Sequence, residues 1–368
     1  MPLLRRPRTS DVENFSLLFW ARIMSSGPDW RHVAAGCALL VSHVLSAQTL
    51  AAGASVQAGA PAVQAPAGES KNINDWLMRM HEASGKRSYI GTFVVSYDGV
   101  MSSAKIWHVC EGAQQMERVE TLTGAPRSIY RHNDQVVTFL PGQKVVRTEK
   151  RESLGLFPEL LRSADSRIAE FYKARQEGSE RVAGVEADIV ALIPKDALRF
   201  GYRVWVEPKR GMVVKLQTLD GDGKVLEQAA FSELQFDAPV KMDKLLQMMG
   251  KVEGYRIEKP ELVKTTARAE GWVLKTPVVG FQPMSCYKRP SVVPSRGEPM
   301  QWVFSDGLAS VSVFAEPYDA ERHLKESRMS MGATQSLTRR LDAYWLTVMG
   351  EVPLATLRLF ADGLERRK

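Results

Sequence analysis

Residues 115–142, QMERVETLTGAPRSIYRHNDQVVTFLPG, hold three short runs in which apolar and polar side chains alternate. A Gly-Ala-Pro sequence at 124–126 and an Asn-Asp pair at 133–134 separate the runs, and a Pro-Gly pair at 141–142 ends the stretch. A period of two is typical of strands with one buried face, and these small and polar residues are typical of turns. The stretch therefore predicts a meander of antiparallel strands.

Alternating runs continue on both sides of this meander. Residues 89–97 and 103–110 flank an Asp-Gly turn and predict a hairpin. Later runs of the same kind predict strands at 185–194, 201–208, 212–219 and 224–236. About nine antiparallel strands are typical of a large curved sheet, whose concave face we expect helices to cover.

Two segments have helical spacing instead. Residues 73–83 place apolar side chains on one helical face, with a cap at Asn74 or Asp75 and a stop at Gly85. Residues 151–175 also carry apolar side chains at helical intervals. We therefore expect a helix before the sheet and a helical or irregular insertion within it.

A second, smaller unit follows a charged and methionine-rich junction. Strand-like runs lie at 271–281, 300–315 and 343–350, and residues 354–364 predict a helix. The expected fold is thus mostly β with some α (α+β). A large domain built on a curved antiparallel sheet is joined to a small α+β domain. The expected boundaries are residues 71–240 for the first domain, 241–268 for a linker and 269–368 for the second domain.

The N-terminal part has the features of a secretory leader. An apolar run at residues 33–41 follows Arg31, and small residues suited to cleavage follow it, which predicts a signal peptide within residues 1–54. Acidic residues before Met24 are unusual in a leader, so we expect translation to begin at Met24. A buried helix of a cytosolic domain is the alternative. Residues 55–70 are rich in Ala, Gly and Pro and predict a disordered spacer.

Charge and cysteine content restrict the function. Residues 241–368 carry 20 basic and 15 acidic side chains, so much of the +7 net charge lies in the last third of the chain. Such an excess suits an acidic peptide or an anionic lipid, or is simply a solvated surface. The mature chain keeps Cys110 and Cys286, which fall in different predicted domains. We expect two separate buried thiols, with a single disulfide as the alternative.

Catalytic and ligand-binding motifs are missing. His81-Glu82 begins a zinc-protease pattern, but the second histidine is replaced by Gly85. The Gly-Asp-Gly-Lys sequence at 221–224 joins two predicted strands and does not open a helix, so it predicts a turn and not a phosphate loop. We expect no catalytic residue, no cofactor, no metal site and no nucleic-acid partner.

Aromatic side chains are the informative residues of the first domain. They lie at alternating positions of predicted strands or on the helical insertion, and either fill the interior or line a cavity for an acyl chain. The candidate lipid-binding residues are Phe93, Trp107, Phe139, Phe157, Phe171, Tyr172 and Trp205.

Longer blocks of sequence carry a resemblance to a known family. These blocks are FPELL at 157–161, RVAG at 181–184, FGYRVWVEPKRGMVVKLQTLDGDGKVLEQAAFSELQF at 200–236 and WLTVMGEVPLATL at 345–357. Together they resemble the MucB/RseB family of periplasmic sigma-E regulators, from Trp76 to about Leu364.

The resemblance implies a fold and a function. The first domain would resemble the LolA/LolB lipoprotein carriers, a large unclosed antiparallel β-barrel with helices packed in its concave face. The second would bind the periplasmic segment of a transmembrane anti-sigma factor of the RseA/MucA type. Binding would shield that segment from the site-1 protease, and lipopolysaccharide or another acyl-chain ligand would release it. We therefore expect a periplasmic protein, not an enzyme, and a homodimer is a further expectation.

Residues of the last third are candidates for contact with this partner. Arg339, Arg340, Tyr344 and Trp345 lie close together in sequence around the predicted strand. Arginines at the rim would steer an acidic segment and exposed aromatic side chains would anchor it. Alternatively, Trp345 belongs to the core and the arginines are solvated.

Two other functions remain open from the sequence. A periplasmic carrier of lipoproteins or lipids would use the same barrel, but it would not need the second domain. A hydrolase of envelope lipids would need a nucleophile and a base, and the sequence shows neither motif.

Overall fold

The computed structural model describes residues 73–150, 167–260, 262–288 and 298–367. Everything it describes falls within one compact unit. The predicted leader, the start at Met24 and the spacer lie outside the described residues, and so does most of the helical insertion.

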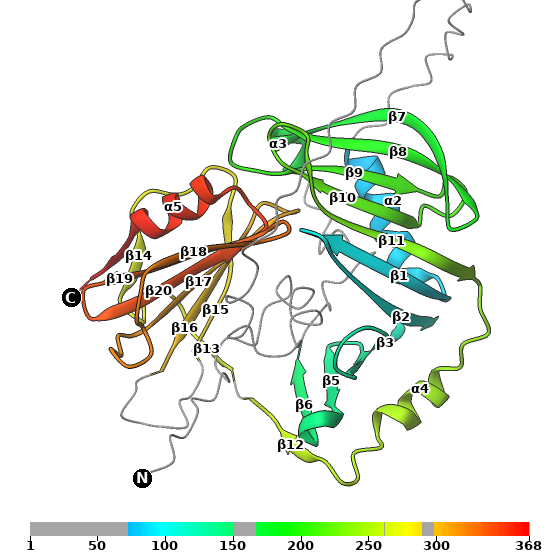
Figure 1. Ribbon diagram of the computed structural model, residues 1–368, viewed down its shortest axis with the longest axis horizontal. Coiled ribbons are helices and arrows are strands. Elements are labelled where there is room, and N and C mark those ends of the chain that lie inside the picture. Colours follow the sequence, from blue (N-terminus) through cyan, green and yellow to red (C-terminus); the bar gives the residue numbers. More distant parts are fainter. Residues whose placement is uncertain (1–72, 151–166, 261, 289–297, 368) are drawn as a thin grey trace, which may run out of the picture. The chain divides into compact units, whose positions relative to one another are not determined.

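The first part of the chain forms a twelve-stranded sheet with the order β12-β6-β5-β4-β3-β2-β1-β11-β10-β9-β8-β7 (Figure 1). Its strands are β1 (Tyr89–Tyr97), β2 (Val100–Glu111), β3 (Gln114–Thr121), β4 (Ser128–His132), β5 (Gln135–Leu140), β6 (Val145–Lys150), β7 (Tyr172–Val182), β8 (Val185–Pro194), β9 (Gly201–Val206), β10 (Val213–Leu219), β11 (Val225–Phe236) and β12 (Arg256–Glu258). All neighbours are antiparallel except β6 and β12, which run parallel. Strands β7 and β12 end the sheet, so it is unclosed, as predicted.

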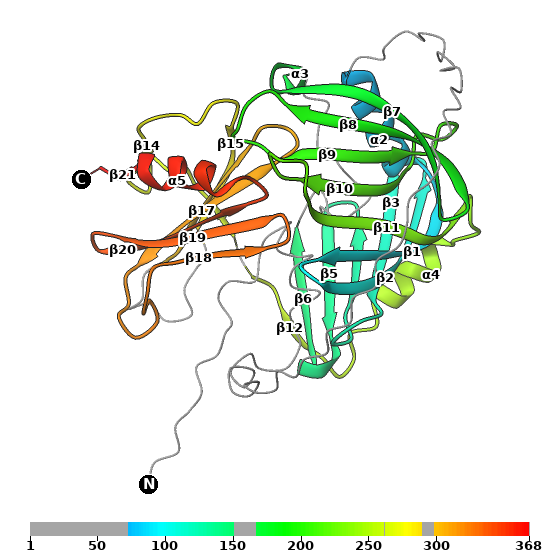
Figure 2. The ribbon, with the colours of Figure 1, turned by 45° about the horizontal axis from the view of Figure 1, so that its top comes forward.

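The predicted meander is confirmed as β3, β4 and β5. Strand β3 pairs with β4 from Met116 to Glu120, and β4 pairs with β5 through a two-residue turn. Asn133 adopts a left-handed φ of +52° in this turn, a conformation that asparagine tolerates better than most residues. Figure 2 shows β5 and β6 running steeply across the direction of β7–β11, so the sheet is strongly curved.

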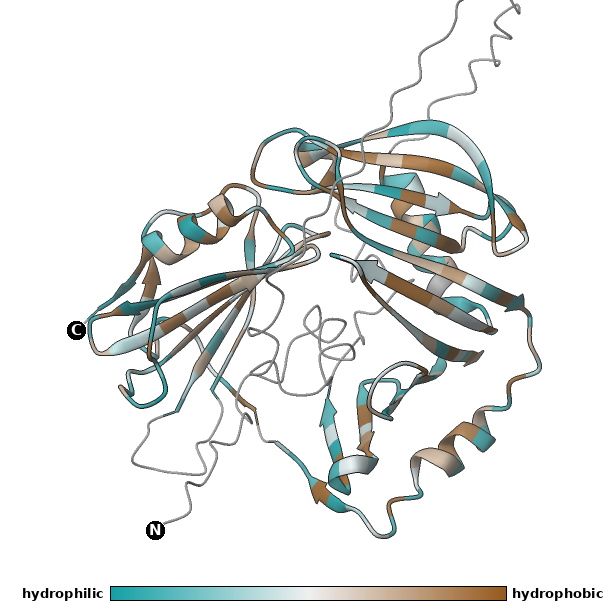
Figure 3. Ribbon diagram, viewed as in Figure 1, coloured by the Kyte–Doolittle hydropathy of each residue, from teal (hydrophilic) through white to brown (hydrophobic). Residues whose placement is uncertain are grey.

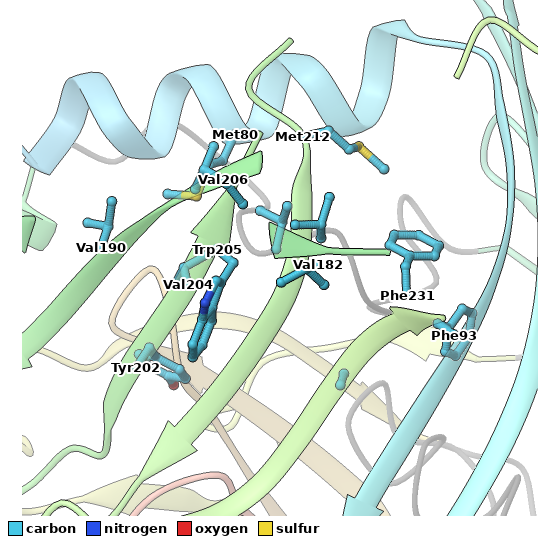
Figure 4. Packing of buried hydrophobic residues seen from close by; sticks show 14 of the residues in the cluster. Met80, Phe93, Val182, Val190, Tyr202, Val204, Trp205, Val206, Met212 and Phe231 are labelled. Atoms are coloured by element: carbon cyan, nitrogen blue, oxygen red, sulfur yellow. The ribbon is translucent and has the colours of Figure 1, made fainter. Parts of the chain in front are cut away.

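Two helices pack on opposite faces of this sheet. Helix α2 (Ile73–Lys86) buries Trp76, Leu77 and Met80 in the cluster that contains Ile106 of β2. Helix α4 (Met242–Met249) buries Met242, Leu245 and Met249 in the cluster that contains Val109 of β2. Ile106 and Val109 are three residues apart on one strand, and successive side chains of a strand alternate between faces. We call the two sides the α2 face and the α4 face; Figure 4 shows Met80 of α2 above the strands.

Three helix predictions need correction. Asn74 and Asp75 lie inside the first turn of α2 and do not cap it, and the helix continues past Gly85 to Lys86. Within the described part of the insertion, α3 covers Ile168–Phe171, and residues 172–175, which we expected to be helical or irregular, belong to strand β7, because Tyr172 already pairs with Pro194. The methionine-rich junction, where we expected no regular element, contains α4.

The last part of the chain forms a seven-stranded sheet with the order β13-β15-β16-β17-β20-β19-β18, which we call the second sheet. Its strands are β13 (Val263–Lys264), β15 (Gln282–Lys288), β16 (Met300–Ser305), β17 (Ser310–Pro317), β18 (Ser327–Met331), β19 (Thr334–Leu341) and β20 (Tyr344–Gly350). Helix α5 (Leu354–Gly363) contacts β17, β19 and β20. A separate pair is formed by β14 (Trp272–Leu274) and β21 (Leu364–Arg366). The strand-like run at 300–315 forms β16 and most of β17, the strand at 343–350 and the helix at 354–364 are confirmed as β20 and α5, and the run at 271–281 contains only the short strand β14.

Hydropathy explains which strands the sequence revealed. In Figure 3 hydrophobic and hydrophilic residues alternate along inner strands of the large sheet, whereas the terminal strand β7 is largely hydrophilic. Strand β7 is exposed along most of its length, and β18 is exposed almost throughout. Edge strands without a buried face lack the alternation that predicts a strand.

Candidate functional site

The predicted lipid-binding residues divide between the two faces of the large sheet. Phe93 pairs with Ala104, whereas Trp107 lies three residues further along β2 and therefore on the opposite side. The register of the following strands places Phe139 on the side of Trp107, the α4 face. The strand pairing therefore separates the set, and one cavity on one face cannot be lined by all of it.

On the α2 face, the predicted residues fill the interior. Phe93 is 1% exposed, and its ring meets the ring of Phe231 edge to face at 6.2 Å. Tyr172 is also 1% exposed and belongs to the same hydrophobic cluster. These two side chains stabilise the sheet as core residues.

Each of the two tryptophans has a cationic neighbour, and Trp205 is 3% exposed within the cluster that contains α2. The guanidinium of Arg118 lies 4.5 Å from the ring centre of Trp107, and the ammonium of Lys215 lies 4.1 Å from the ring of Trp205. The indole N–H of Trp205 also donates a 2.6 Å hydrogen bond to Glu180. These contacts fix the orientation of the rings and add about 0.5–2 kcal/mol each.

Phe139 packs in an aromatic group beneath α4. Its ring lies 5.5 Å from both Tyr130 and Tyr255, edge to face. Phe171 ends α3 and lies against Arg199, described next. Phe157 lies outside the described residues.

A buried arginine that sequence reasoning missed connects the large sheet to the second sheet. Arg199, in the loop before β9, is 2% exposed. Its Nε donates a 2.8 Å hydrogen bond to Asp306 in the β16–β17 turn, and Nη2 donates a 2.6 Å bond to the carbonyl of Val279. Nη1 donates to Asp196 in its own loop. We call this group the Arg199 junction.

Aromatic rings and a glycine complete the Arg199 junction. The guanidinium lies 4.3 Å from the ring centre of Phe171 and 5.1 Å from that of Phe281. The hydroxyl of Tyr172 donates a 3.2 Å hydrogen bond to Asp306. A Cβ at Gly280 would lie 1.9 Å from Nη2 of Arg199, so only glycine fits there. Two predicted lipid-binding residues, Phe171 and Tyr172, therefore belong to this junction.

A second contact between the sheets gathers carboxyl groups. The β1–β2 turn meets the β18–β19 turn, where Asp98 accepts a 2.9 Å hydrogen bond from Gly332 N–H. Glu227 of β11 accepts a 3.4 Å bond from Ala333 N–H. We call this group, with the nearby Glu351, the Glu227 junction.

Burial and mutual repulsion disfavour ionisation in the Glu227 junction. Burial raises the pKa of Glu227 to about 7; Asp98 adds to the rise and the Ala333 N–H opposes it. Burial, together with the Glu227 carboxyl, raises the pKa of Glu351 to about 8. The strength of this contact therefore depends on pH near neutrality.

The predicted partner-binding residues lie on neighbouring strands of the second sheet. Arg339 and Arg340 of β19 pair in register with Leu346 and Trp345 of β20. Arg339 forms an ion pair with Asp362 of α5. The guanidinium of Arg340 lies 3.9 Å from the ring centre of Tyr318.

The two aromatic residues of this set differ from the exposed anchors that we expected. Trp345 is 7% exposed and stacks on His323 at 4.9 Å with an interplanar angle of 6°. Tyr344 is half-buried, between Trp272 at 5.0 Å and the guanidinium of Arg366 at 4.4 Å. Both rings pack within the unit, which agrees with the alternative that Trp345 is a core residue.

The two cysteine thiols are poor nucleophiles in this fold. Cys110 and Cys286 are separate thiols, as expected; Cys286 is buried and Cys110 half-buried. Burial raises the pKa of each thiol to about 11, with smaller contributions from Glu117 and Glu270 respectively. A thiol with such a pKa carries little thiolate at neutral pH and is a poor nucleophile.

A buried polar network lies beside Cys110. His108 is fully buried, with Nδ1 2.7 Å from the carbonyl of Arg87 and Nε2 3.6 Å from Glu117. Glu117 accepts a 2.8 Å bond from Arg131. Although burial acts against it, Arg131 and His108 hold the pKa of Glu117 below its usual value. This network satisfies buried charges and orients β2, β3 and β4.

Within the described ranges, no three His, Cys, Asp or Glu side chains are grouped so that they could hold a metal ion. Over the same ranges, no helix is both long enough and apolar enough to cross a bilayer.

Comparisons with known proteins agree in family over both sheets. The family model of the MucB/RseB N-terminal domain matches residues 72–249, and that of the MucB/RseB C-terminal domain matches residues 266–365. The sigma factor AlgU regulatory protein MucB of Pseudomonas aeruginosa is 31% identical over 299 residues, which cover 79% of this chain and 90% of the relative. The sigma-E factor regulatory protein RseB of Escherichia coli is 22% identical, over 78% of this chain and 89% of the relative.

Solved structures give a similar result. A crystal structure of MucB in complex with MucA(peri) superposes with a TM-score of 0.62 and 27% identity, covering 81% of this chain and all of the other. The complex of Pseudomonas aeruginosa MucA and MucB gives a TM-score of 0.63 and 28% identity, over 80% of this chain and 99% of the other.

Proposed function

This chain belongs to the MucB/RseB family, and from that premise we propose that it regulates an envelope-stress sigma factor. It would bind the periplasmic segment of a transmembrane anti-sigma factor, protect that segment from site-1 proteolysis and so restrain the sigma-E response. The observation that carries the proposal is the match of both family domains, in order, to one chain. Relatives of nearly the same extent are named as regulators of AlgU and sigma-E.

We further propose that the second sheet carries the partner site. The basic excess of residues 241–368 suits an acidic segment, and Arg339 and Arg340 lie on a strand of this sheet. We also retain the division into domains at residues 71–240 and 269–368 as a proposal. A lipoprotein or lipid carrier remains the alternative function, and it leaves the second sheet unexplained.

We propose that the protein acts in the periplasm and has no catalytic activity. Periplasmic action follows from the partner's location and agrees with the leader-like sequence at residues 1–54. The raised thiol pKa values of Cys110 and Cys286 support a binding role.

A direct binding experiment tests the regulator proposal. The purified chain is titrated with the soluble periplasmic segment of the anti-sigma factor from the same organism, and with a scrambled segment as control. We expect saturable binding of the native segment alone, and slower cleavage of that segment by the site-1 protease when the chain is present. A folded chain that leaves both binding and cleavage at the level of the scrambled control would contradict the proposal.

Lipid release requires its own test. We propose that lipopolysaccharide or another acyl-chain ligand weakens partner binding. The complex is titrated with lipid A, with a headgroup analogue that lacks acyl chains as the control. Loss of bound segment with lipid A alone is the expected result, and a complex unaffected by saturating lipid A would refute this part.

A further inference from the structure

Strand β18 differs from β7, β12 and β13, the other terminal strands of the two large sheets, because only one charged residue, Arg328, protects its edge. It ends the second sheet and pairs only with β19. Its sequence, Ser-Arg-Met-Ser-Met, carries one charge, and its pairing shows no register shift. Met329 is 65% exposed. A regular, exposed edge strand is a template on which another chain can add a strand.

The other edges are protected. Strand β7 carries several charged side chains and a register shift between Gln176 and Gly178. Strand β12 has three residues and an ion pair between Arg147 and Glu258. Strand β13 has only two residues. Charges, irregular pairing and short length are the usual protections of an edge, and β18 has none of them beyond Arg328.

Both ends of β18 are fixed, so the edge is preformed. At one end, the following turn is held by the hydrogen bonds from Gly332 to Asp98 and from Ala333 to Glu227. At the other end, Ser327 N–H donates a 3.0 Å hydrogen bond to the hydroxyl of Thr338. A fixed strand loses little conformational freedom when a partner strand binds.

The hairpin geometry shows which backbone groups face outward. Met331 pairs with Thr334 across the two-residue turn, so this pair exchanges the hydrogen bonds that close the hairpin. In antiparallel pairs, hydrogen-bonded and non-hydrogen-bonded positions alternate. Ser330 and Arg328 are therefore non-hydrogen-bonded positions toward β19, and their N–H and C=O groups point away from the sheet.

Basic side chains lie near β18 on the face of the second sheet that α5 covers. Arg328 pairs with Leu337 and so shares a face with Arg339, which contacts α5 through Asp362. The exposed Arg358 lies on α5. Met329 lies on the opposite face, with Arg340. A strand added to β18 would thus meet the positive charge of Arg328 on one face and the exposed Met329 on the other.

We propose that β18 is the docking edge for an extended segment of the anti-sigma partner in which acidic and apolar residues alternate. The segment would add as an antiparallel or parallel strand, with backbone hydrogen bonds to Arg328 and Ser330 and acidic side chains beside Arg328. This inference rests on the proposed function. It moves the contact from the buried rings of Tyr344 and Trp345 to the open edge two strands away.

A proline substitution tests the backbone contact in the full chain. Ser330→Pro removes an outward N–H and leaves the bonds to β19 in place, whereas the matched control Ser330→Ala keeps that N–H. We expect Ser330→Pro to weaken binding of the periplasmic segment at least about tenfold and Ser330→Ala to bind within about twofold of wild type. Circular dichroism and the unfolding midpoint establish that both variants are folded.

Two further measurements keep the test decisive if the proline variant does not fold. Arg328→Glu should weaken binding and reduce its salt dependence, while Lys173→Glu on the exposed edge β7 should leave both unchanged. Hydrogen exchange of the wild-type complex should show slower exchange in residues 328–331. Unchanged exchange there, or a folded Ser330→Pro variant that binds normally, overturns the inference.

The outcomes separate this inference from the function on which it rests. A wild-type chain that does not bind the segment refutes the proposed function. If the wild-type chain and the Ser330→Pro variant bind the segment equally well, only the assignment of β18 as the docking edge is refuted. If Ser330→Pro abolishes self-association in light scattering and leaves segment binding intact, a second copy of this chain occupies β18 and the inference is wrong.

Discussion

The two junctions between the sheets bury charge in opposite ways. At the Arg199 junction, a cation meets Asp306, and both side chains are fully buried. At the Glu227 junction, carboxyl groups of Glu227, Glu351 and Asp98 lie near one another, and backbone N–H groups donate to Asp98 and Glu227. Loss of a charge should therefore destabilise the first junction and, near neutral pH, stabilise the second. Carboxyl-to-amide substitutions test this difference directly.

The largest effect is expected for Asp306→Asn. The amide keeps the shape and can still accept from Leu308 and Ala309 in the turn, but it leaves the buried Arg199 guanidinium with only the partly exposed Asp196 as a counter-charge. We expect the free energy of unfolding to fall by about 3 kcal/mol in urea titrations of the full chain. Asp196→Asn is the control, because Asp196 is partly exposed and should cost about 1 kcal/mol or less. Equal effects of the two substitutions would contradict the role assigned to burial.

Gly280→Ala should disturb the same junction by steric overlap. Gly280 has a φ of +85°, and the added Cβ would also lie 2.9 Å from the ring of Phe171. We expect a loss of about 3 kcal/mol, of which about 1 kcal/mol comes from the backbone conformation alone. Gly254→Ala measures that backbone part, since Gly254 has a φ of +79° and no atom within 4 Å of its Cβ position. If the two variants unfold at the same denaturant concentration, the packing around Arg199 is looser than described.

Removal of a carboxyl group from the Glu227 junction should raise the stability of the protein, and the gain should depend on pH. Both raised pKa values mean that the folded state keeps protons that the unfolded chain has already lost. Stability is therefore fully present below about pH 4.5 and falls as pH rises toward 8. Glu351→Gln removes one of the two groups, so it should flatten this profile, with about 1 kcal/mol of stabilisation at pH 8 and no change at pH 4.5. The unfolding midpoint measured across this range, with Glu321→Gln in an exposed loop as control, checks the sign.

Tyr172→Phe should have the smallest effect and separates two roles of this residue. The substitution removes the hydroxyl that donates to Asp306 and keeps the ring in the core. We expect about 1 kcal/mol of destabilisation and unchanged uptake of a fluorescent fatty acid. Loss of uptake in a folded Tyr172→Phe variant would show that the hydroxyl contacts the lipid.

The fold was predictable where burial produces a pattern. The meander at 115–142 alternates because one side of each strand is buried, and its turns use asparagine and glycine at left-handed positions. Strands β18 and β19 escaped prediction because the first has no buried side and the second places polar residues, Thr334 and Ser336, at buried positions. Helix α4 escaped because its eight residues are too few to show a period clearly.

The sites were less predictable than the fold. The aromatic residues were chosen correctly as strand residues, but which face each occupies depends on register counted across several strands. Arg199 lies in a loop, and its importance comes from Asp306 and Val279, both far away in sequence. A single sequence contains no local signal for such a long-range contact.

Strand β1 lies inside the large sheet, and its two edges become paired at different times as the chain is synthesised. Strands β1 to β6 pair with their neighbours in sequence, so they can associate at once, whereas the second edge of β1 waits for β11. Strand β12 then adds to β6 after α4 has formed, which closes the other exposed edge. A chain interrupted before residue 225 would leave both of these edges open. That intermediate is the form most exposed to aggregation and to quality-control proteases.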